Sequence, residues 1–122
     1  MASRRLTATT NLQDVFSVLG QSLPVATVLT DLYSAGSEVF AVISSIWVCN
    51  TGSNRAKFRI SVAVAGAANV NSQYLFYDTP INIGDSRVAV AGITLGPDNV
   101  IRVYSDTGFV AFAVFGDEIV GG

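Results

Sequence analysis

The sequence predicts an all-β protein: a single antiparallel β-sandwich of seven or eight strands with jelly-roll or immunoglobulin-like connections. Strand-forming residues outnumber helix signals, and glycine or small polar residues interrupt them about every ten residues. From Lys57 to Val64, polar and apolar side chains alternate with a period of two. The chain has 122 residues, of which 50% are hydrophobic and 13% charged. This composition suits one domain with one core and excludes intrinsic disorder.

The first 24 residues are expected to lie outside the sandwich as an N-terminal arm, which leaves residues 25–122 as the domain. Asn11 is a candidate N-cap for a short helix over Leu12–Leu19, which Gly20 would end. Such a helix has one apolar stripe and is too short to be stable alone in water. We therefore expect the arm to bind a partner surface. The residues assigned to this role are Arg4, Arg5, Leu12, Val15, Phe16 and Leu19.

The expected strands follow in chain order. The first is Thr27–Tyr33. The second, Glu38–Asn50, is the most apolar segment, so it is expected to be a central strand covered on both faces, with a bulge at Ser44 and Ser45. A turn at Thr51–Asn54 follows it. The remaining strands are expected at Lys57–Val64, Gln73–Tyr77, Arg87–Ala91, Ile93–Leu95, Val100–Tyr104 and Phe109–Phe115.

The residue types present exclude several kinds of chemistry. The chain has no histidine, which removes Ser-His-Asp and Cys-His nucleophilic sites and the commonest zinc ligand. Most of its nine carboxylates stand beside turn residues, where local hydrogen bonding explains them better than catalysis or calcium binding. Asp117 and Glu118 are adjacent, so on a strand they should point to opposite sides. We expect no enzymatic activity, no cofactor and no metal site.

Two further features have a structural interpretation. Cys49 follows Trp47 in the most apolar strand, which predicts a buried and unreactive thiol. Arg55, Lys57 and Arg59 form a basic stripe, which fits a solvated face protecting a sheet edge better than a contact to an acidic partner. Because the net charge of the chain is −2, no nucleic-acid partner is expected.

The aromatic residues suggest a surface with a function. Alternation places Tyr74 and Phe76 on one face of a strand and Tyr77 on the other, which makes this cluster a candidate ligand platform. The chain also has seven phenylalanines, four tyrosines and one tryptophan, with few charges. Such an apolar excess on a small β-domain is typical of an interface. We therefore expect a homo-oligomer, with a trimer favoured.

No apolar segment approaches the ~20 residues of a transmembrane helix, so no membrane partner is expected. The start of the chain lacks the apolar core of a secretory signal. A lone cysteine without glycosylation sequons fits synthesis in a reducing cytoplasm.

Six short segments between residues 27 and 119 carry a further pattern. They are Glu38–Asn50, Phe58–Val62, Tyr74–Ile81, Gly92–Leu95, Val100–Tyr104 and Phe115–Ile119. Together they resemble a family of small structural proteins of tailed bacteriophages.

This resemblance implies a virion protein, assembled in the cytoplasm of the bacterial host. The favoured role is a capsid decoration or cement protein that binds the major capsid protein on the outer head surface. A tail, neck or baseplate accessory protein is an alternative. A second alternative, from a different class of protein, is a carbohydrate-binding module that uses Tyr74, Phe76 or Tyr77.

Overall fold

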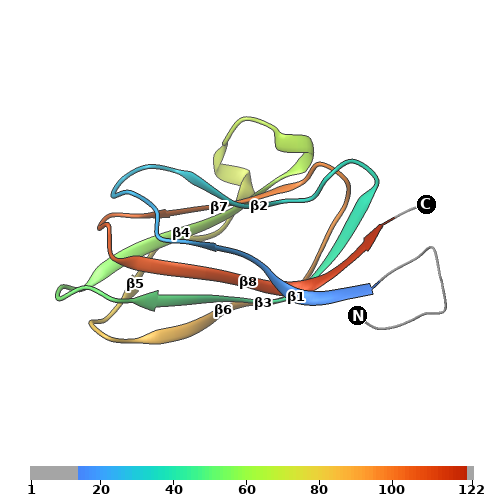
Figure 1. The fold of residues 1–122 in the computed structure, drawn as a ribbon. Helices are drawn as coiled ribbons and strands as arrows, with labels where there is room; N and C mark the ends of the chain where they lie inside the picture. Colours follow the sequence, from blue (N-terminus) through green and yellow to red (C-terminus); the bar gives the residue numbers. More distant parts are fainter. Residues whose placement is uncertain (1–13, 121–122) are drawn as a thin grey trace.

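The computed structural model describes residues 14–120, and in this range the side chains of all but residues 14–16, 90, 91 and 120. The described residues form eight strands in two four-stranded sheets (Figure 1). The strands are β1 (Asp14–Ser22), β2 (Thr30–Ser34), β3 (Val39–Asn50), β4 (Ala56–Ala63), β5 (Tyr74–Ile81), β6 (Ser86–Leu95), β7 (Val100–Ser105) and β8 (Val110–Val120). Two 3-10 turns, η1 (Val64–Gly66) and η2 (Asn71–Gln73), lie between β4 and β5. The predicted all-β sandwich is confirmed.

The pairing of the strands is that of a jelly roll. Sheet A has the order β1-β8-β3-β6, and sheet B has the order β2-β7-β4-β5. β1 pairs with β8, β2 with β7, β3 with β6 and β4 with β5, all antiparallel. The chain is therefore one long hairpin, with its tip between β4 and β5, rolled so that successive pairs alternate between the two sheets. This order selects the jelly roll over the immunoglobulin-like alternative.

The core lies between the sheets and is filled by the inward side chains of both. Phe58 of β4 has no exposed surface, and its ring centroid lies 5.7 Å from that of Phe76 on β5 and 6.1 Å from that of Phe112 on β8. The second contact is edge-to-face and joins sheet B to sheet A. Aliphatic side chains such as Ile43 and Ile46 of β3 complete the core around these rings.

The longest strand, β3, is covered on one face and open on the other. The register with β8 shifts between Ile43 and Ser45, which confirms the predicted bulge. The prediction that this strand is covered on both faces is wrong. Ile46 and Val48 are buried, whereas Trp47 between them is 44% exposed. The described residues place no second layer over the outer side of sheet A, so the apolar outward residues of β3 remain in contact with solvent.

The predicted helix over Leu12–Leu19 is wrong. Residues 14–22 form β1, which pairs along its length with β8. Two helical turns have little stability of their own, whereas β1 satisfies backbone groups along an edge of β8 that would otherwise be open. The register shifts between Val18 and Gly20, and Leu19 packs against the core. The sandwich therefore includes residues 14–22, which the sequence pattern assigned to an arm.

A substitution at Gly20 tests whether β1 is built into the sandwich. A Cβ atom at Gly20 would lie 2.3 Å from the carbonyl oxygen of Leu32 on β2, so the backbone would have to move. Gly20→Ala should lower the free energy of unfolding by about 1–3 kcal/mol, measured by urea denaturation. Gly36→Ala is the matched control, because its Cβ would meet Val39 at 3.4 Å, and it should leave stability nearly unchanged. Equal stabilities for the two variants would show that residues 14–22 are not packed as described.

Candidate functional site

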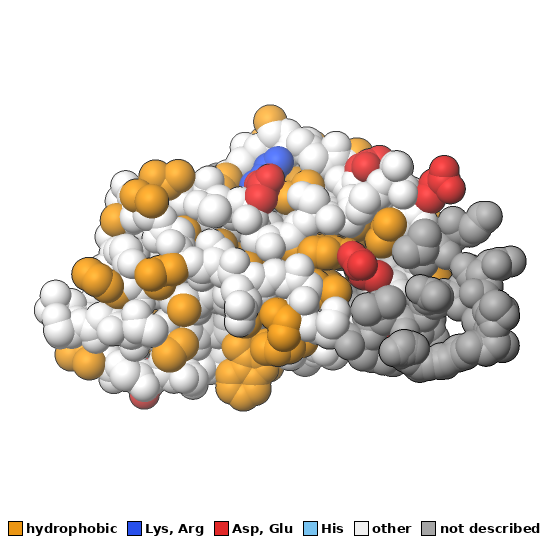
Figure 2. Space-filling view, in the orientation of Figure 1, with side chains coloured by type: hydrophobic (Ala, Val, Ile, Leu, Met, Phe, Trp, Pro, Cys, Tyr) orange, Lys and Arg blue, Asp and Glu red, His pale blue; other side chains and the backbone are white. Residues whose placement is uncertain are grey.

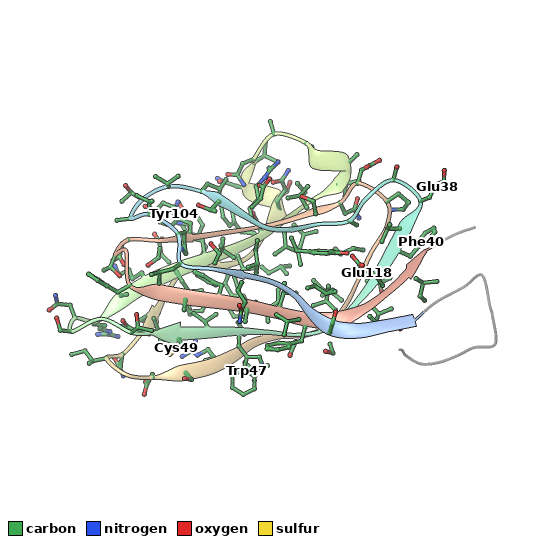
Figure 3. The ribbon with its side chains drawn as sticks, viewed as in Figure 1. Glu38, Phe40, Trp47, Cys49, Tyr104 and Glu118 are labelled. Atoms are coloured by element: carbon green, nitrogen blue, oxygen red, sulfur yellow. The ribbon has the colours of Figure 1, made fainter. Side chains whose placement is uncertain are left out.

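The outer side of sheet A carries several large exposed apolar side chains, and we call this surface the A face. It consists of the outward side chains of the four strands. Trp47 on β3 lies directly opposite Val88 on β6 and Ala113 on β8, so the three side chains share this side of the sheet. Figure 3 shows Trp47 projecting away from sheet B, and Figure 2 shows a hydrophobic projection at the same lower edge of the molecule. The exposed large apolar residues of the A face are Val18, Phe40, Val42, Trp47 and Val88.

The exposed side chains described on the A face carry no charge. Arg87 of β6 is in register with the buried Val48, so its Cβ points to the opposite side of the sheet. Asp117 of β8 is in register with Val42 but is only 7% exposed. A solvent-exposed apolar sheet face of this kind is typical of an interaction surface.

A groove of about 400 Å³ runs along the A face beside Trp47. Small side chains line much of it, among them Cys49, Ala111 and Ala113, and Leu23 lies at its border. On β8, Ala113 is in register with Trp47 and Ala111 with Cys49, so the face has a large projecting ring next to a shallow hollow.

Cys49 is part of this surface. The prediction that its thiol is fully buried is wrong, because Cys49 is half-buried and lines the groove. Its side chain follows the alternation of β3 to the outer side, where the cross-strand neighbours Ala111 and Ser86 are too small to cover it. The thiol therefore reports on whatever covers the A face.

The outer side of sheet B is different, because it carries charged side chains, several of which are paired within the chain. The Arg59 side chain donates two hydrogen bonds to Asp78, at 2.7 and 3.3 Å. Its guanidinium carbon lies 4.2 Å from the ring centroid of Tyr77 and 4.3 Å from that of Tyr104. The hydrogen bond from Arg59 lowers the pKa of Asp78. Since β4 lies between β7 and β5, the predicted edge-protecting role of the basic stripe is wrong.

The loop between β4 and β5 adds to the paired charges of sheet B. Arg102 of β7 donates hydrogen bonds to the carbonyl oxygens of Ala67 and Gly66, at 2.8 and 3.3 Å. It also lies 3.3 Å from a carboxylate oxygen of Asp31 on β2. Figure 1 shows this loop standing out on the side of sheet B. The loop is therefore anchored to the outer side of sheet B.

The aromatic cluster on β5 is divided differently from the prediction. Phe76 packs inward against Phe58, whereas Tyr74 and Tyr77 meet edge-to-face on the outer side with ring centroids 4.9 Å apart. The cause is a bulge: Ile60 pairs with Phe76, but the next residue of β4 pairs with Tyr74, so the alternation of β5 breaks between them. Simple alternation along the sequence cannot show this shift.

Only three of the six residues predicted to bind a partner fall within the described part of the chain. Three of them lie outside the described residues: Arg4, Arg5 and Leu12. Val15 and Phe16 lie on β1, where their backbones pair with β8. Leu19 packs against the core of the same sandwich, so it is not part of a free docking stripe. The sequence pattern that indicates the A face lies in β3, where apolar residues stand at both odd and even positions.

The adjacent carboxylates of β8 point to opposite sides, as expected. Glu118 is in register with buried Ala41 and accepts a hydrogen bond from the hydroxyl group of Tyr33 on β2. This contact links the two sheets. Burial raises the pKa of the Tyr33 hydroxyl group well above its usual range, and the neighbouring Glu118 carboxylate raises it further. Tyr33 therefore keeps its proton in the folded protein.

Within residues 14–120, no group of three or more histidine, cysteine, aspartate or glutamate side chains is placed to hold a metal ion. The same residues contain no helix long and apolar enough to cross a membrane. No protein-family model matches the chain, and searches of curated proteins and of solved structures gave no match.

The Tyr33–Glu118 contact predicts a loss of stability at alkaline pH. Because the pKa of Tyr33 is higher in the folded than in the unfolded chain, its contribution is complete below about pH 10 and is lost as the pH rises beyond it. Tyr33→Phe should cost about 1–2 kcal/mol at neutral pH and reduce the alkaline loss, as measured by urea denaturation across this range.

The matched control for Tyr33→Phe is Tyr74→Phe. This substitution removes a hydroxyl group that is bonded to Asn69 on an exposed loop, so it should leave the alkaline loss intact. A Tyr33→Phe variant with the same pH profile as the unmodified protein would contradict the role given to this contact.

Proposed function

We propose that this chain is a structural subunit of a bacteriophage virion and that it acts, without enzymatic activity, as a decoration protein on the outer capsid. The observation that carries the proposal is the A face. It is a solvent-exposed apolar sheet surface whose described exposed side chains carry no charge, whereas Arg59 and Arg102 on the opposite side of the sandwich are paired within the chain. A subunit that works inside an assembly has neighbours to cover such a surface.

The fold supports the same class of function. Jelly rolls of eight strands serve as capsid subunits and also as lectin domains. The segments that resemble phage structural proteins fall on β3 to β8 of the sandwich. Two of them, Glu38–Asn50 and Phe115–Ile119, lie side by side in sheet A, because β3 pairs with β8. The first of these segments contributes Trp47 and Phe40 to the A face.

The partners in this proposal are further copies of the chain, with a trimer favoured, and the major capsid protein. A tail, neck or baseplate position is the alternative within the same class, since an apolar assembly face serves either place.

A carbohydrate-binding module is the second candidate, favoured by one observation. Tyr77 is 55% exposed on the outer side of sheet B and meets Tyr74 edge-to-face. Exposed rings with nearby polar groups are common features of ligand sites. In such a site Arg59 and Asp78, which are bonded to each other, would fix the position of the Tyr77 ring.

Virion composition tests the proposal. In virions purified from the phage that encodes the chain, quantitative mass spectrometry should find several hundred copies, as expected for a capsid decoration protein. A few dozen copies would place the chain on the tail or neck. If purified virions lack the chain altogether, the proposal fails.

Glycan binding separates the second candidate. A decoration protein should show no glycan-array signal that depends on Tyr77. A signal lost in Tyr77→Ala and kept in Phe109→Ala, another exposed aromatic residue, would favour the carbohydrate-binding module instead.

A further inference from the structure

We infer that copies of this chain associate through the A face, with Trp47 of one copy seated in the groove beside Trp47 of the next. The inference rests on the proposed function and assigns a contact between copies to particular residues. A contact made by the same face of both copies is two-fold and closes as a dimer, so the dimer takes the place of the trimer favoured above. The occupant of the A face is a second copy of the same chain.

The first argument is shape. The A face has both a projecting ring, Trp47, and a hollow lined by small residues such as Cys49, Ala111 and Ala113. Contacts between identical subunits need a surface that complements a surface of the same chain, and a projection next to a hollow meets this requirement. Buried aromatic side chains in pockets also provide most of the binding energy in many interfaces.

The second argument is charge. The exposed side chains described on the A face are uncharged, whereas the outer side of sheet B carries Lys57, Arg59 and Arg102 with Asp31 and Asp78. A partner that recognised this chain through charge would bind the charged side. An apolar face of this kind gains most from another apolar face, and the chain itself supplies one.

The third argument is area. Sheet A has four strands, and its longest strand has 12 residues. The other three strands have 9, 10 and 11 residues. With strands about 4.8 Å apart and about 3.3 Å per residue, the face measures roughly 19 Å by 35 Å, or about 670 Å². A stable interface of standard size buries about 800 Å² on each partner. The extent of the A face is therefore close to what a stable dimer needs.

Two reporters lie at the proposed contact. Trp47 is the only tryptophan in the chain, and Cys49 is the only cysteine. In the unmodified protein, the Trp47 emission should shift to shorter wavelength between nanomolar and tens of micromolar protein. Over the same range the labelling of Cys49 by a thiol reagent should become slower, and light scattering should report a dimer.

A matched pair of valine substitutions tests the location. Val88 is 44% exposed and is the cross-strand neighbour of Trp47 on the A face. Val70 is 53% exposed and lies in the loop before β5. Val88→Glu places an unpaired carboxylate in the interface and should raise the dissociation constant at least about 100-fold. Val70→Glu adds the same charge elsewhere and should leave the oligomer intact. Circular dichroism checks that both variants are folded.

Trp47→Ala provides a second, independent variant, because it removes the projecting ring and adds no charge. It too should dissociate the oligomer in light scattering. A monomeric unmodified protein at tens of micromolar would overturn the inference. An oligomer that survives both Val88→Glu and Trp47→Ala would also overturn it. The same holds if Cys49 becomes protected from the thiol reagent only when capsids are added.

Failure of this inference and failure of the proposed function can be told apart by virion composition. A chain that is monomeric in solution but present in virions removes the inference and keeps the function. If Val88→Glu dissociates the oligomer as expected but the chain is absent from virions, the inference holds and the proposed function fails.

Discussion

The ladder between β3 and β8 is the constraint on which the rest of the structure depends. It pairs residues 39–50 with residues 110–120, so it joins segments about 70 positions apart and leaves β8 between β3 and β1. Without it, β1 would lose its place in sheet A, and the contact between Phe112 and Phe58 that connects the two sheets would be lost. Closing such a long loop is costly in chain entropy, and the buried apolar residues on both strands offset that cost.

The same ladder gives the molecule its two sides. Residues of β3 and β8 that face inward build the core, and the residues between them, Trp47 and Ala113 among them, build the A face. On sheet B, by contrast, Arg59 and Arg102 bind carboxylates, rings or loop carbonyl groups of the same chain. One side is therefore satisfied internally, and the other keeps apolar surface that only a neighbour would remove from water.

Local patterns predicted the regular parts of this fold well. The alternation around Phe58 and the apolar run ending at Asn50 gave strands close to those observed, and Ser44 and Ser45 marked the bulge in β3. The errors lie where distant pairing changes a local pattern. Helical spacing up to Leu19 was overridden by pairing with β8, and the bulge in β5 moved Phe76 to the opposite side from Tyr74. The candidate site was missed because an apolar strand has the same sequence whether both faces are buried or one is open.

The sequence by itself determined the class of the fold, because strand periodicity, turn residues and apolar content depend on near neighbours along the chain. It also determined that nucleophilic chemistry based on histidine is absent. The tertiary structure alone decided that the sandwich is a jelly roll, that residues 14–22 belong to it, and that Trp47 and Cys49 face outward. The physical reason is that alternation separates two faces of a strand but does not say which face another layer covers. That depends on pairing between residues far apart in the chain.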